Sequence, residues 1–126
     1  MEAKEKEKIL LVDDDEVVLG KLGNMLEHKG WKCLKAPTGE IALDAFEMND
    51  VDVVILDINL PRIDGFEVLK KMKALKPNVP IVILTALGYE KEEVDKALNL
   101  GAAGYVGKAM PVISIVSTIK RVLGHK

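Results

Sequence analysis

"VDVVILD" (residues 51–57) is a nearly continuous run of apolar, mostly β-branched residues that ends on an acid. A strand that is apolar on both faces is typical of a parallel sheet covered by helices on both sides. Four further short runs have continuous or alternating apolar patterns that predict strands: "KILLV" (8–12), "WKCLKA" (31–36), "VPIVILT" (79–85) and "GYVG" (104–107).

Apolar residues recur at helical spacing between and after these strands, and each recurring set predicts the apolar side of a helix that faces the core. The predicted helices are a segment that ends at Gly30, one that carries Ile41, Ala42, Ala45, Phe46 and Met48, one that begins at Asp64, one that carries Val94, Ala97 and Leu98, and one from Pro111 to Leu123. Five strands alternating with five helices predict an α/β fold with a doubly wound parallel sheet, because right-handed crossovers place helices on both faces.

The composition is that of an ordinary globular domain. The chain has 126 residues, 48% of them hydrophobic, and a formal net charge of -2. This balance excludes the disordered and fibrous classes and gives no electrostatic reason to expect direct nucleic-acid or anionic-membrane binding. We expect one domain over residues 8–124, preceded by a charged tail at residues 1–7.

The single cysteine and the absence of a long apolar segment bear on location. Cys33 has no partner for an internal disulfide and is expected to be a buried strand thiol, which is consistent with a reducing cytoplasm. The longest apolar stretch, residues 79–87, is about half of the roughly 20 residues that a membrane span needs. We therefore expect a cytoplasmic protein without a membrane contact.

Chemically informative residues stand where the predicted strands end. Asp13 and Asp14 follow the first strand, Asp57 ends the third, Thr85 ends the fourth and Lys108 follows the fifth. Each alone has an ordinary structural explanation, such as a helix cap, a packed threonine or a solvated lysine. Together they would lie at the carboxyl edge of one parallel sheet, which is where open α/β sheets bind ligands.

The chemistry of this set is mutually supporting. Three converging carboxylates repel one another strongly without a cation, and hard oxygen ligands suit Mg²⁺. Lys108 would supply a point charge and Thr85 a hydroxyl donor for phosphoryl oxygens, which leaves Asp57 as the candidate nucleophile. The next two acids, Asp15 and Glu16, are expected at the start of the first helix, where they favour the helix dipole.

Four motifs in order, "LVDD" (11–14), "VVILDINLPRIDG" (53–65), "VILTA" (82–86) and "GAAGYVGK" (101–108), resemble the receiver domain of two-component response regulators. The resemblance covers residues 8–124. It implies a flavodoxin-like (βα)5 fold with strand order 2-1-3-4-5. It also implies a phosphoacceptor function, with a sensor histidine kinase or a phosphotransfer protein as the donor.

Residue by residue, the resemblance implies that Asp57 is phosphorylated with Mg²⁺ as cofactor. Asp13, Asp14 and the backbone carbonyl of Asn59 would complete the protein ligands of the metal. Such a domain catalyses only its own phosphoryl uptake and loss and is not an enzyme in the usual sense.

The resemblance also implies a switch. Thr85 and Lys108 would contact the phosphoryl group, and Tyr105 would rotate inward behind Thr85. The expected output is a downstream effector or a homodimer, bound through the face formed by the fourth helix, the fifth strand and the last helix.

The chain departs from the family pattern after its lysine. Ala109 follows Lys108, whereas the family usually has a proline joined by a cis peptide there, and the proline is displaced to Pro111. A cis bond to a non-proline residue costs about 3 kcal/mol, so either this loop is strained or the peptide is trans and the turn is rebuilt. Leu87 offers no group to orient an attacking water, which predicts slow dephosphorylation.

Three alternatives stay open. The chain could be a phosphorylation-incompetent scaffold, or the receiver fragment of a longer DNA-binding transcriptional regulator. A hydrolase of the dehalogenase-like class is a third, although it expects an aspartate where this chain has Asn59. A Rossmann-type enzyme is disfavoured, because the turn after the first strand is acidic and lacks the glycines that admit a pyrophosphate.

Overall fold

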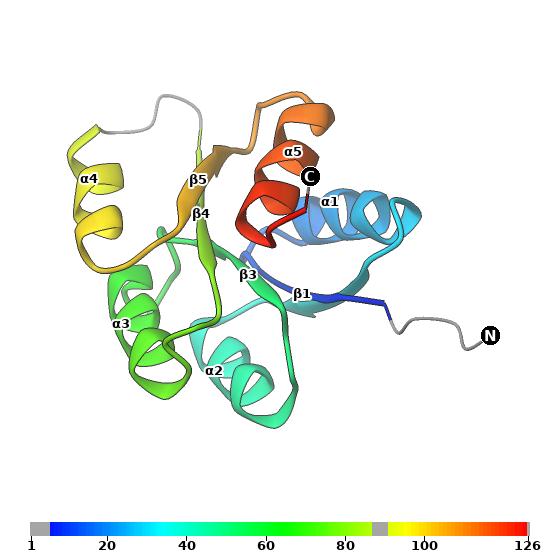
Figure 1. Cartoon of the computed structure of the whole chain (residues 1–126). Helices are drawn as coiled ribbons and strands as arrows, with labels where there is room; N and C mark the ends of the chain where they lie inside the picture. Colours follow the sequence, from blue (N-terminus) through cyan, green and yellow to red (C-terminus); the bar gives the residue numbers. More distant parts are fainter. Residues whose placement is uncertain (1–5, 87–90, 126) are drawn as a thin grey trace.

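Five parallel strands form one sheet in the order β2-β1-β3-β4-β5 (Figure 1), in a computed structural model that describes residues 6–86 and 91–125. The strands are β1 (Lys8–Val12), β2 (Lys32–Ala36), β3 (Val53–Asp57), β4 (Ile81–Thr85) and β5 (Gly104–Gly107). The helices are α1 (Glu16–His28), α2 (Gly39–Met48), α3 (Gly65–Leu75), α4 (Lys91–Asn99) and α5 (Val112–Val122). The predicted flavodoxin-like fold and strand order are confirmed.

The sheet is covered on both faces, with α1 and α5 on one side and α2, α3 and α4 on the other (Figure 1). Alternate residues of the central strands enter opposite cores, because side chains of a strand alternate between its faces. Ile9 and Leu11 pack with α1 and α5, whereas Leu10 and Val12 pack toward α2 and α3. All residues of β3 and β4 are buried, which explains their continuous apolar sequences.

Several helix ends follow the expected signals. Asp64 caps α3 by accepting a hydrogen bond from the Phe66 N–H. Pro111 directly precedes α5, and this segment is helical as predicted although it is rich in β-branched residues. Gly124, with φ of 80°, ends α5 in a turn where the His125 N–H donates to the carbonyl of Lys120. This is a Schellman-type cap, for which a left-handed glycine is favoured.

One close approach in the loop after β3 requires glycine. A Cβ atom at Gly65 would collide with the backbone of Ile58. The absence of a side chain lets the start of α3 pack directly on the residue that follows Asp57. The same loop contains Arg62, a non-glycine residue with φ of 69°.

Some expectations about burial are wrong. Cys33 is only partly buried, because β2 is an edge strand. Met48 is 83% exposed and Ile41 and Leu98 are also exposed, because α2 and α4 bury only a narrow stripe each. Among the described residues, no helix is long and apolar enough to cross a membrane.

Candidate functional site

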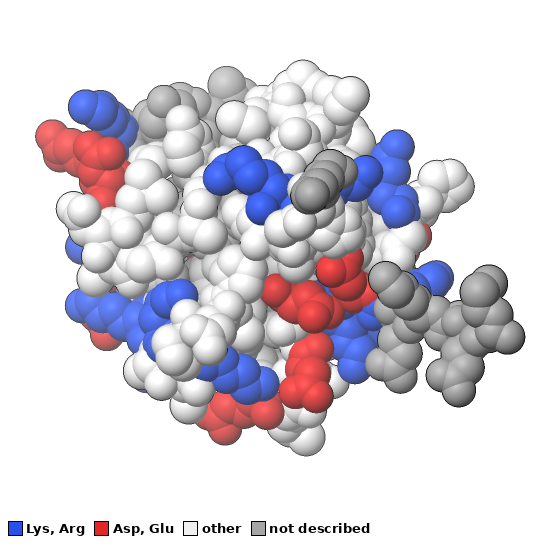
Figure 2. Space-filling view, in the orientation of Figure 1, with Lys and Arg blue, Asp and Glu red and all other residues white. Residues whose placement is uncertain are grey.

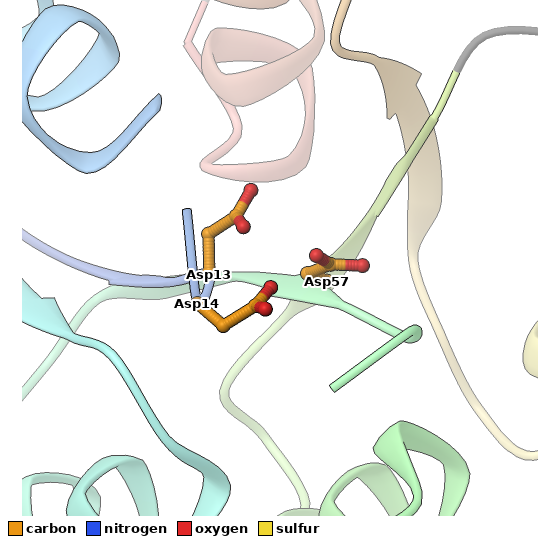
Figure 3. Close-up of side chains that lie close together, drawn as sticks. All are labelled: Asp13, Asp14 and Asp57. Carbon is orange, nitrogen blue, oxygen red and sulfur yellow. The ribbon is translucent and has the colours of Figure 1, made fainter. Parts of the chain in front are cut away.

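The ends of β1 and β3 bring three carboxylates together. Asp13 and Asp14 follow β1, and Asp57 is the last residue of β3, which pairs directly with β1. One carboxylate oxygen from each residue lies within 4.8 Å of the others. Figure 3 shows the three side chains beside one another at these strand ends. The sheet register therefore assembles the acidic set that the sequence predicted.

The three acids differ in exposure. Asp13 and Asp57 are 0% and 1% exposed, whereas Asp14 is exposed. Two backbone N–H groups orient the buried pair, because Asp15 donates to Asp13 Oδ1 at 2.9 Å and Asn59 donates to Asp57 Oδ1 at 2.8 Å. The Oδ2 atoms of both buried acids are left to face Lys108.

Lys108 joins the two buried carboxylates. Its Nζ lies 2.8 Å from Asp13 Oδ2 and 3.0 Å from Asp57 Oδ2, with 23% of the lysine side chain exposed. The peptide between Lys108 and Ala109 is trans, and the turn closes with a hydrogen bond from the Met110 N–H to the carbonyl of Gly107. The departure from the family pattern at Ala109 thus leaves the lysine within the site.

The ionisation of these groups is set by burial and by their mutual contacts. Burial raises the pKa of Asp13 above its ordinary value of 3.8, and the nearby Asp57 charge adds to the rise, while Lys108 and the Asp15 N–H oppose it. Burial alone lowers the pKa of Lys108, but its contacts with Asp13 and Asp57 more than offset this, so its pKa lies above 10.5. The lysine therefore stays charged at neutral pH.

The donor set fits a hard divalent cation. Asp13 Oδ2 is buried, and although Lys108 Nζ is near it, no donor reaches it with hydrogen-bond geometry. The Lys108 ammonium is the cation that faces this oxygen, and its one positive charge offsets only part of the charge of three neighbouring carboxylates. The site contains three carboxylates and one ammonium group, and exposed Asp14 gives access from solvent. Asp13, Asp14 and Asp57 could hold such an ion with water completing its shell.

The remaining predicted residues, Thr85, Tyr105 and Asn59, lie on β4, on β5 and in the loop after β3. Thr85 is 4% exposed and ends β4 next to Asp57, and its hydroxyl donates to the carbonyl of Val106 at 3.4 Å. Tyr105 is partly buried on β5 and packs against the core on the α2–α3 side. Asn59 is exposed and contacts Asp57 through its backbone N–H.

The structure confirms the expected positions of two acids near the site and adds one contact that the sequence did not predict. Asp15 caps α1 by accepting from the Val17 N–H, and Glu16 stands in its first turn, as expected. The direct bridge from Lys108 to Asp13 was not foreseen, because no pattern in the sequence gives the path of the loop after β5. Leu87, expected to affect dephosphorylation, lies outside the described residues.

Comparison with known proteins identifies similar chains. The response regulator receiver domain family matches residues 9–120. The chain is 38% identical over 118 residues to the alkaline phosphatase synthesis transcriptional regulatory protein PhoP of Bacillus subtilis, covering 92% of this chain and 48% of that protein. It thus spans about half the length of that regulator.

A shorter relative and a solved structure match along most of the chain. Sporulation initiation phosphotransferase F of Bacillus subtilis is 33% identical over 120 residues, covering 95% of this chain and 96% of that protein. A response regulator protein from Burkholderia pseudomallei, with a phosphorylated aspartic acid, a calcium ion and citrate, aligns with a TM-score of 0.83 at 26% identity, over 94% of this chain and 69% of that one.

Proposed function

The chain belongs to the response regulator receiver family of two-component signalling, and from this premise we propose that Asp57 accepts a phosphoryl group. The donor is a phosphohistidine on a sensor histidine kinase or a phosphotransfer protein. The single observation that supports this most strongly is the buried Asp57 carboxylate, held beside two further acids and Lys108 at the sheet edge. The receiver unit spans residues 8–124, with residues 1–7 outside it.

In the proposed reaction, the ionised Asp57 carboxylate attacks phosphorus in line with the leaving group. A P–O bond forms, the P–N bond to the donor imidazole breaks, and the imidazole leaves with the electron pair. No general base is needed, because the nucleophile carries no proton. The Asn59 N–H orients the carboxylate, and the Lys108 ammonium stabilises charge on the transferring oxygens.

We propose that Asp13, Asp14 and Asp57 hold Mg²⁺, with the backbone carbonyl of Asn59 as a further ligand. When bound, the ion neutralises charge shared by the acids and the phosphoryl oxygens. Three neighbouring carboxylates against a single ammonium group support this assignment. The Burkholderia pseudomallei protein, which has a similar fold and a phosphorylated aspartic acid, supports phosphorylation of an aspartate in this fold.

The proposed switch uses Thr85 and Tyr105. The phosphoryl group adds roughly two negative charges beside β4. Thr85 exchanges its hydrogen bond to Val106 for one to the phosphoryl group, and Tyr105 turns inward. The face formed by α4, β5 and α5 then binds an effector or a second copy. We place the protein in the cytoplasm, with no direct contact to nucleic acid or membrane by this domain.

Phosphoryl uptake can be tested with acetyl phosphate and Mg²⁺. Intact-mass spectrometry should show one added phosphoryl group on the wild type and none on Asp57→Asn, with chelation of Mg²⁺ preventing uptake. No adduct on the wild type would favour a scaffold instead. Sustained release of phosphate from phosphate esters would favour a hydrolase.

A further inference from the structure

A groove between α2 and α3 lies away from the acidic site and from the α4–β5–α5 face. It has a volume of about 500 Å³ and is lined by seven residues. α2 contributes four of them at positions i, i+3, i+4 and i+7, and α3 contributes three at i, i+3 and i+4. Both sets are single helical stripes, so the groove follows the two helices side by side.

The floor of this α2–α3 groove is apolar. Leu43 is partly buried and packs against the core, while Leu75 on α3 is 47% exposed. Ala74 is exposed, and its small side chain leaves room beside Leu75. An inserted apolar side chain would therefore find apolar contacts at the bottom of the groove.

The α2 rim of the groove is acidic, and the α3 rim adds one exposed lysine, Lys71, so the lining as a whole has a net negative charge. Glu40, Asp44 and Glu47 are all exposed, and in the part of the chain that the structure describes none of them forms an ion pair. Like charges at i, i+4 and i, i+3 repel one another along a helix. Figure 2 shows acidic side chains over α2 at the lower edge of the view. This repulsion would be relieved by a cationic partner.

We propose that the α2–α3 groove docks a basic amphipathic helix from a partner protein. The stripe from Glu40 to Glu47 is about 10 Å long, which matches two turns of a helix. Leucine-like side chains would enter between Leu43 and Leu75, and lysines or arginines would face the α2 carboxylates. A second copy docked about a two-fold axis would set this acidic rim against its own copy, so a basic segment complements the groove better.

The probe is a synthetic helical peptide of about 14 residues, with leucines at i and i+4 flanked by lysines, titrated into ¹⁵N-labelled protein. Chemical-shift changes should map to α2 and α3. The triple variant Glu40→Gln, Asp44→Asn and Glu47→Gln should bind the peptide about tenfold more weakly, since each of the three exposed charge contacts contributes a factor of about two. Leu75→Gln should weaken peptide binding by a similar factor and leave the protein folded, because Leu75 is an exposed residue.

The matched control neutralises three exposed carboxylates elsewhere, by Glu27→Gln, Glu92→Gln and Asp95→Asn, and should leave the affinity unchanged. Equal weakening in both triple variants, or shifts centred outside α2 and α3, would overturn the proposal in favour of diffuse electrostatic attraction. Self-association that is lost in the groove variant would overturn it in favour of a second copy. Phosphoryl uptake by Asp57 should be unchanged in the groove variant, so the two proposals fail independently.

Discussion

Replacing Lys108 with methionine tests how the buried acids are held. Lys108 Nζ is 2.8 Å from Asp13 Oδ2 and 3.0 Å from Asp57 Oδ2, and these two carboxylate side chains are 0% and 2% exposed. Removing one partner of a buried ion pair costs about 3–5 kcal/mol, because the remaining charge is left uncompensated. Lys108 is itself partly exposed, so we expect Lys108→Met to lower the free energy of unfolding by about 3 kcal/mol.

The loss should depend on pH with a defined sign. Burial already raises the pKa of Asp13, and removing the ammonium raises it further. An acid with a raised pKa binds more protons in the folded than in the unfolded protein, so its charged form destabilises the fold above that pKa. The destabilisation by Lys108→Met should therefore shrink as the pH is lowered from neutrality toward the raised pKa of Asp13, where this carboxyl group takes a proton.

Urea unfolding followed by Trp31 fluorescence measures the free energy of unfolding at each pH. Trp31 reports on unfolding because it is only 5% exposed and packs in the core beneath α1 and α5. Lys70→Met is the control, since its ion pair with Glu67 is half exposed and should contribute at most about 0.5 kcal/mol. Adding Asp13→Asn to Lys108→Met should restore part of the stability. A pH-independent loss below about 0.5 kcal/mol would refute the reasoning.

Four further outcomes follow from local structure. Burial raises the pKa of Cys33 from 9.0 to about 11. At about pH 8, iodoacetamide should therefore label Cys33 about 100-fold more slowly in the folded protein than in the urea-unfolded protein, because the thiolate is the reactive form. Equal labelling rates would contradict this. Arg62 has φ of 69°, so Arg62→Gly should keep or slightly raise stability, whereas Arg62→Val should lower it by about 1–2 kcal/mol in thermal or urea unfolding. The Lys76 ammonium donates to two carbonyls at the end of α2, at 2.7 and 3.0 Å, and Lys76→Met should cost about 1–2 kcal/mol, with the exposed Lys29→Met as a neutral reference. Ala109→Pro should leave phosphoryl uptake intact by intact-mass spectrometry, and a loss would show that the present trans loop is required.

Much of the fold could be read from the sequence because its signals are local. The apolar runs ending at Val12, Asp57 and Thr85 appear as strands with those same ends. The helix starts expected at Asp15 and Asp64 are present, and both aspartates act as N-caps. Periodicity and capping act over a few residues, so neighbouring side chains suffice to indicate them.

Burial of individual helix residues was harder to predict. Met48 and Leu98 lie on helices whose type was predicted correctly, yet both are exposed. A helix presents a stripe to the core, and the width of the stripe depends on how closely the neighbouring elements approach. That approach is a property of packing between distant segments.

The order of elements could be read from the sequence alone, and in a parallel sheet this order places Asp13, Asp14, Asp57 and Thr85 at one edge, because all strands of such a sheet end on the same side. The burial of Asp13 beside an exposed Asp14, and the contact of Lys108 with the acids, depend on tertiary packing. Lys108 and Asp57 are 51 residues apart. Their contact depends on strand register and on the path of the turn after β5, which no local pattern encodes.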